Sequence, residues 1–141
     1  MTDFHFTHPI EVRYADLDPQ GHVDNAHFLT YFEQARVHYF IQLGLFTNKQ
    51  SFLDMGIILA DAHVIYLSPV LFGVAVHVGV RVSRLGTKSL TMEYRMVDEA
   101  TGRELATGST VLVTFDYIKH VSIEIPEVWR QQISAFEGLA G

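Results

Sequence analysis

The chain has 141 residues and a mass of 16.0 kDa, about the size of one domain. Ten basic against sixteen acidic residues give a net charge of −6, which argues against a nucleic-acid partner, because such proteins carry a basic surface. The chain has no cysteine, so thiol catalysis, disulfides and thiolate metal sites are excluded.

Hydrophobic residues make up 48% of the chain, too many for a disordered protein, and the apolar runs are too short to insert into a membrane. No repeat or linker divides the sequence, which predicts a single domain over residues 1–141. The first residues carry an acid and no basic region, so we expect no signal peptide and a cytoplasmic protein.

The first predicted element is a half-buried strand over residues 10–14, where apolar and polar side chains alternate. A loop follows over 16–24, since this stretch is rich in acids and amides and contains a proline and a glycine. Residues 25–43 then carry apolar side chains at steps of three and four, which predicts one long helix. Asp24 is placed to cap its start, and Gly44 to close its end.

Beyond this helix the pattern is mostly that of strands. Residues 57–66 form one candidate strand, and three runs with clear alternation follow at 74–82, 90–96 and 111–117. Glycine-containing turns join the last three runs, which predicts an antiparallel meander. A short helix is expected over 127–136, after a proline. The sequence therefore predicts an α+β fold with an antiparallel sheet of about five strands packed on one long helix.

The residues best suited to chemistry lie in the loop before the long helix. Asp16 and Asp18 are two apart and point the same way in an extended chain, and Pro19 holds Asp18 in that geometry. The following helix start leaves free N–H groups and a partial positive charge nearby. This arrangement suits acyl transfer, because amides polarise a carbonyl that a carboxylate can attack, directly or through water.

The motif Asp-x-Asp-x-x-Gly-His-Val-x-Asn-x-x-Phe over residues 16–28, followed by Glu33-x-Ala35-Arg36, resembles that of the hotdog-fold acyl-CoA thioesterases. The nearer match is to the 4-hydroxybenzoyl-CoA thioesterase class and its long-chain acyl-CoA thioesterase branch. The resemblance covers nearly the whole chain and implies a hotdog fold, with the sheet wrapped around the helix. It also implies hydrolysis of an acyl-CoA to a free acid and coenzyme A. One departure is Phe28, where relatives more often carry tyrosine.

The resemblance also implies roles for individual residues. Asp18 matches the catalytic carboxylate, as nucleophile or as general base, and the backbone N–H of Asn25 matches the donor that polarises the thioester carbonyl. Lys88 and Arg84 lie where relatives hold the phosphates of coenzyme A, usually from a neighbouring subunit. The family assembles as a dimer whose two sheets join, with active sites at the interface, and is often paired again into a homotetramer. Medium or long aliphatic acyl groups are slightly favoured.

Other residues of the motif are expected to support the site. His22 hydrogen-bonds the loop or lines the pocket, with acid–base work as an alternative. Phe28 and Phe32 belong to the buried helix face and also border the acyl group. Glu33 and Arg36 brace the helix end and the loop, beyond a simple ion pair on the helix surface.

Asp16 is expected to shape the loop as a hydrogen-bond acceptor rather than to react. A zinc site built on His22 and His27 is disfavoured, because two zinc ligands on one helical face usually sit four residues apart and these sit five apart. No metal or redox cofactor is expected, since coenzyme A is part of the substrate.

Three other functions stay open at the level of sequence. Acyl carrier protein would replace coenzyme A as the thiol carrier, although the chain shows few clustered basic residues to dock it. A hotdog dehydratase would need a histidine–acid pair built from His22 or His27. A non-catalytic acyl-binding module would keep the fold alone, and the joint presence of Asp18, Gly21 and Asn25 argues against it.

Overall fold

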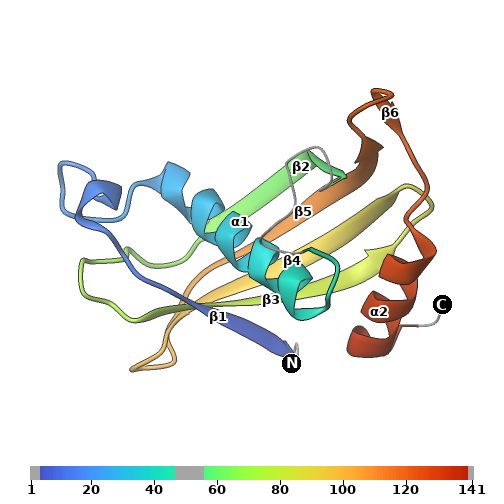
Figure 1. Ribbon diagram of the computed structural model, residues 1–141. Coiled ribbons are helices and arrows are strands. Elements are labelled where there is room, and N and C mark those ends of the chain that lie inside the picture. Colours follow the sequence, from blue (N-terminus) through green and yellow to red (C-terminus); the bar gives the residue numbers. More distant parts are fainter. Residues whose placement is uncertain (1–3, 47–55, 140–141) are drawn as a thin grey trace.

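The computed structural model describes residues 4–46 and 56–139, in which an antiparallel sheet curves around one long helix (Figure 1). The sheet order is β1-β3-β4-β5-β2, and the short β6 pairs with β5. In chain order the elements are β1 (Phe6–Ile10), the 3-10 turn η1 (Tyr14–Asp16), α1 (Asn25–Gln42), β2 (Ile57–Tyr66), β3 (Val76–Leu85), β4 (Ser89–Asp98), β5 (Glu104–Asp116), β6 (Val121–Ser122) and α2 (Glu127–Glu137).

The core lies between α1 and the concave face of the sheet. Alternation in the strands directs one set of side chains to this face, including Val78 and Val80 of β3, which are fully buried. Phe32 of α1 stacks on Tyr94 of β4 with ring centroids 4.7 Å apart. The ring also covers Gly108, where an added Cβ would lie 2.5 Å from a Phe32 ring carbon. A side chain of the helix therefore packs directly on a position of the sheet that has no side chain.

Most of the predicted elements are confirmed. The long helix begins at Asn25 and is capped by Asp24, whose carboxylate accepts the N–H of Ala26 at 3.0 Å. It ends at Gln42, and Gly44 follows with a left-handed φ of 76°. The strand expected over 57–66 has those bounds, the antiparallel meander is present, and the terminal helix begins at the expected residue.

The first predicted strand is wrong. The strand that pairs with β3 is Phe6–Ile10, and the chain tightens into a 3-10 turn at Tyr14–Asp16. Pro9 lacks an N–H and argues against a strand, but β1 lies at the edge of the sheet, where one missing donor is tolerated. Two further differences are that β5 begins earlier than expected, at Glu104, and that β6 was not predicted.

None of the helices in residues 4–46 and 56–139 has the length and hydrophobicity needed to cross a lipid bilayer.

Candidate active site

The loop between η1 and α1 folds back on itself as a tight turn that begins at Asp18. The Asp18 N–H donates to the carbonyl of His22 at 2.7 Å, and the Gly21 N–H donates to the carbonyl of Asp18 at 2.9 Å. Gly21 has a φ of 83°, a conformation that glycine adopts without steric cost. Leu17 and Val23 pair across the turn. These contacts fix the position from which the Asp18 side chain extends.

The Asp18 carboxylate is held by the turn that it begins. Its Oδ1 accepts the N–H of Gln20 at 2.9 Å and the N–H of His22 at 3.2 Å. Both bonds end on the same oxygen, so the turn does not use the other oxygen of the carboxylate. The side chain is half-buried. Asp18 is therefore a carboxylate of fixed direction with one oxygen left for another group.

Asp18 borders an open cavity of about 440 Å³ together with the start of α1. His22, Asn25 and Phe28 also line this cavity, so the structure brings together four of the residues that the sequence singled out. Asn25 is the first residue of α1, where backbone N–H groups have no partner within the helix and the helix dipole is positive. A carboxylate and a polarising helix end face the same space.

Tyr66, at the end of β2, is a site residue that sequence reasoning missed. Its hydroxyl donates to the backbone carbonyl of Asn25 at 3.1 Å, and its ring meets Phe28 edge-on at 4.9 Å. Phe28 is buried and its side chain has no hydroxyl. The hydroxyl at this corner of the cavity therefore comes from Tyr66 of β2 rather than from α1. Because 41 residues separate Tyr66 from Asn25, local sequence patterns gave no sign of the contact.

Asp16 lies behind the site and ties the loop to α1. Its carboxylate has no exposed surface and accepts hydrogen bonds from the Arg13 backbone and guanidinium at 2.8–3.1 Å and from the Tyr31 hydroxyl at 2.7 Å. Burial alone would raise the pKa of the Asp16 carboxyl, but these hydrogen bonds outweigh it and lower that pKa to about 2. Burial also raises the pKa of the Tyr31 hydroxyl. These contacts join the loop to α1, and the loop-shaping role of Asp16 stays a prediction.

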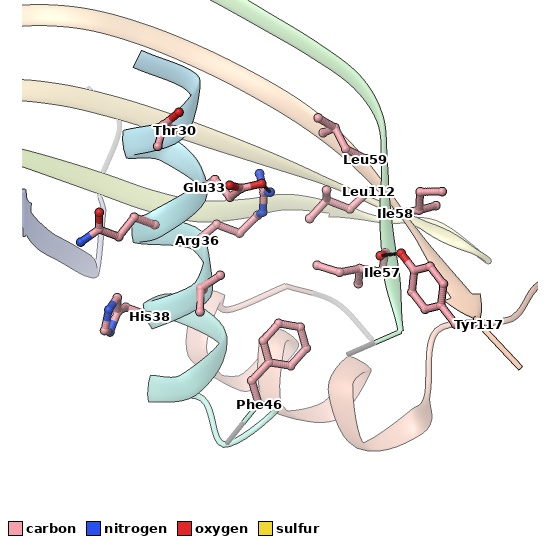
Figure 2. Close-up of a pocket in the computed structure, with 12 residues that line it drawn as sticks. Thr30, Glu33, Arg36, His38, Phe46, Ile57, Ile58, Leu59, Leu112 and Tyr117 are labelled. Carbon is pink, nitrogen blue, oxygen red and sulfur yellow. Dashed lines mark hydrogen bonds and ion pairs between the residues drawn. The ribbon is translucent and has the colours of Figure 1, made fainter. Parts of the chain in front are cut away.

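A second, larger cavity of about 670 Å³ lies between α1 and β2 (Figure 2). Its walls are mostly apolar and include Ile57 and Leu59 of β2 and Leu112 of β5. Glu33 and Arg36 reach into it from α1, as Figure 2 shows. The Arg36 guanidinium lies 3.5 Å from the Glu33 carboxylate. The pair therefore borders a cavity further along α1 than the turn that it was expected to brace.

The structure does not bring every candidate residue to Asp18. Phe32 has no exposed surface and lies in the core, outside both cavities. Arg84 and Lys88 are exposed at the turn between β3 and β4. That turn is at the end of the sheet far from Asp18, since His22 pairs with Leu71 just before β3 and this strand then runs on for roughly 30 Å. Their contact with coenzyme A stays a prediction.

Comparisons with known proteins give the family. Residues 12–133 match the model of the thioesterase-like superfamily. A thioesterase from Thermus thermophilus, solved in complex with coenzyme A and Zn, is 38% identical, with a TM-score of 0.84 over 98% of both chains. The PA2801 protein of Pseudomonas aeruginosa is 30% identical, with a TM-score of 0.82 over 93% of this chain and 99% of that one.

A relative from Bacillus subtilis matches most of the chain. The uncharacterized protein YsmA of Bacillus subtilis strain 168 is 31% identical over 113 residues, which cover 79% of this chain and 74% of YsmA. The family model and the solved thioesterases together confirm the expected hotdog fold and support thioester hydrolysis as the general activity. The chain thus belongs to the thioesterase-like superfamily and is a thioester hydrolase.

Proposed function

We propose that the protein hydrolyses acyl-CoA thioesters to a free acid and coenzyme A, with Asp18 as the catalytic carboxylate. The observation that carries the proposal is the shared cavity of Asp18 and the first residue of α1. The two amides on Asp18 Oδ1 support it further, because they orient the carboxylate before any substrate arrives.

In this mechanism the thioester carbonyl oxygen accepts the backbone N–H of Asn25 at the positive end of α1. The other oxygen of Asp18 then attacks the carbonyl carbon, the C–S bond breaks, and the coenzyme A thiolate departs. The acyl group stays on Asp18 as a mixed anhydride, which water hydrolyses. Alternatively Asp18 takes the proton from a water molecule that attacks the same carbon. In both routes the amide stabilises the developing oxyanion, a contribution of roughly 2.7–4 kcal/mol at other acyl-transfer sites.

Coenzyme A as the carrier is supported by the Thermus thermophilus relative, which was solved with it. The distance of Arg84 and Lys88 from Asp18 within one chain is consistent with the two groups meeting across a dimer. We therefore propose a cytoplasmic homodimer, or a tetramer built from it, that needs no metal or redox cofactor. An acyl carrier protein as the thiol carrier is the alternative.

The first test is thiol release from a panel of short, long and aromatic acyl-CoAs by wild type and by Asp18→Asn. We expect the variant to keep its fold and its turn, while kcat falls by about 10²–10⁴ because the amide cannot attack or take a proton. Asp98→Asn is a matched control, because the Asp98 Oδ1 also accepts the N–H two residues on, at 3.0 Å, in a distant turn.

The outcomes separate the alternatives. Near wild-type turnover by Asp18→Asn removes Asp18 from the mechanism. Binding of acyl-CoA without thiol release by wild type identifies a binding module. If only acyl carrier protein thioesters release thiol, the carrier in the substrate is that protein and not coenzyme A.

A further inference from the structure

We propose that the acyl group hydrolysed by this enzyme is a chain with an acceptor oxygen at its distal end, which the Arg36 guanidinium binds. The proposal rests on the proposed function and names its substrate class. It is carried by a buried, incompletely hydrogen-bonded cation in the wall of an otherwise apolar cavity between α1 and β2.

Arg36 is more than nine-tenths buried, yet few of its donors are used. It is 6% exposed. Its Nη1 donates to the Tyr94 hydroxyl at 3.3 Å and its Nη2 to Glu33 Oε2 at 3.5 Å, both at the long end of the hydrogen-bond range. Its Nε is buried without a partner among the described residues. The guanidinium therefore has donor capacity to spare.

The hydrogen-bond partners of Arg36 do not offset the free-energy cost of burying its charge. The Glu33 side chain is 64% exposed, so its charge is largely solvated. The Tyr94 hydroxyl is already bonded to Thr110 at 2.7 Å. A buried charge is costly unless it is paired and hydrogen-bonded. A ligand oxygen beside Arg36 would supply the missing acceptor, while the apolar walls would hold the carbon chain that carries it.

The cavities follow one another along α1 from the catalytic end. The cavity of Asp18 is lined by Asn25 and Phe28. A small cavity of about 130 Å³ follows, lined by Leu29 and Thr30. Arg36 lines both this small cavity and the large one between α1 and β2. The spacing gives the order in which an extended ligand would meet these residues. The thioester lies at Asn25 and the distal oxygen at Arg36.

The length of the chain follows from helix geometry. Arg36 follows Asn25 by about three turns, which is about 16 Å along the axis. Long helical side chains lean back toward the helix start, which shortens the span. An extended chain advances roughly 1.2 Å per bond, so the oxygen would sit about 9–13 bonds from the thioester carbon. A chain of about twelve carbons fits this length, whereas a single aromatic ring ends well short of Arg36.

The test compares matched pairs of substrates. We expect wild type to hydrolyse 12-hydroxydodecanoyl-CoA with a kcat/KM at least about tenfold above that for dodecanoyl-CoA, as a hydrogen bond to a charged group provides. The short pair, 6-hydroxyhexanoyl-CoA and hexanoyl-CoA, is expected to show no such preference, because its hydroxyl cannot reach Arg36. The mono-CoA ester of dodecanedioic acid shows whether a carboxylate is bound better than a hydroxyl.

Arg36→Met is expected to abolish the preference for the hydroxylated twelve-carbon chain while dodecanoyl-CoA is still hydrolysed. Methionine fills similar space, and replacing a buried ion by an apolar side chain is often neutral for stability, which a thermal melt checks. Gln34→Met is the control, since Gln34 lines the same cavity but is exposed.

Several outcomes overturn the proposal: no preference in wild type, a preference that survives in Arg36→Met, or an equal preference in the short pair. A change in dimer dissociation without a change in selectivity assigns Arg36 to a subunit interface instead. Calorimetric binding of dodecanoate and 12-hydroxydodecanoate to wild type and Arg36→Met tests the contact even if no acyl-CoA is hydrolysed. That arm separates failure of this proposal from failure of the proposed function.

Discussion

At the scale of single residues, two carboxylates two positions apart have different surroundings. Asp18 is half-buried at a cavity, while Asp16 is buried and fully engaged with Arg13 and Tyr31. The pKa of Asp16 is lowered from 3.8 to about 2 in the folded protein. As the pH falls, the unfolded chain therefore takes up a proton at Asp16 before the folded protein does. The stability that Asp16 contributes is present above about pH 4 and is lost as the pH falls toward 2.

We expect Asp16→Asn to reduce the free energy of unfolding at pH 7 by about 2 kcal/mol, the value of the pKa difference. The variant also loses less stability than wild type between pH 4 and pH 2, because it lacks the group that titrates there. Urea unfolding at a series of pH values measures both effects, with the exposed Asp61→Asn as control. Parallel pH profiles for wild type and Asp16→Asn would contradict the assignment.

The Tyr66 hydroxyl is expected to position the start of α1 for catalysis. Tyr66→Phe keeps the ring on Phe28 and removes only the bond to the Asn25 carbonyl. One neutral hydrogen bond is worth about 0.5–1.5 kcal/mol, so kcat should fall by about 2- to 10-fold with KM little changed. Steady-state kinetics measure this, and Tyr14→Phe, at a residue that is 83% exposed, is the control. An unchanged kcat would leave Tyr66 with packing alone.

At the scale of elements, the contact of α1 with β5 depends on the missing side chain at Gly108. Gly108→Ala would place a Cβ 2.5 Å from the Phe32 ring and 2.9 Å from the backbone carbonyl of His63. Overpacking of this kind costs typically 1–3 kcal/mol, because helix and sheet must separate. Thermal or urea unfolding measures it, with the neighbouring Ser109→Ala as control. Equal stability of the two variants would show that α1 adjusts freely.

How far the sequence predicts these elements depends on how each one is buried. The helix and the strands of the meander bury one face, so the period of their apolar residues revealed them. β1 was not predicted because its proline is acceptable only in an edge strand. The strand order, which local patterns do not give, places β1 at the edge. The helical period placed Phe32 on the buried face of α1, and Phe32 is buried. Its close packing on Gly108 of β5, and the Arg36–Tyr94 contact, each join residues far apart in the sequence. Neither follows from local patterns.

At the scale of the whole molecule, β2 is the edge strand opposite β1. It pairs only with β5 in the part of the chain that the structure describes, and it exposes apolar side chains that include Ile58, Leu59 and Ile65. A long apolar edge of this kind is a template for pairing with another chain. The proposed dimer would cover it with β2 of a second copy.

We expect sedimentation at micromolar concentration to give a mass of about twice the chain's 16.0 kDa. Ile58→Lys puts a charge on the β2 edge and should shift the protein to monomer. Tyr14→Lys places the same charge at a more exposed aromatic residue outside the sheet and should not. A monomeric wild type, or a dimer that tolerates Ile58→Lys, would contradict pairing through β2.

β2 is also the strand that lines the cavity beside Arg36 and ends at Tyr66, which lines the cavity of Asp18. One strand thus has an outer edge that no strand of residues 4–46 or 56–139 pairs with, and it contributes to the walls of both cavities. If a second copy pairs with that edge, the width of the acyl groove is fixed only in the assembled enzyme. Dilution would then loosen the groove before it unfolds the chain, and substrate selectivity would become a property of protein concentration.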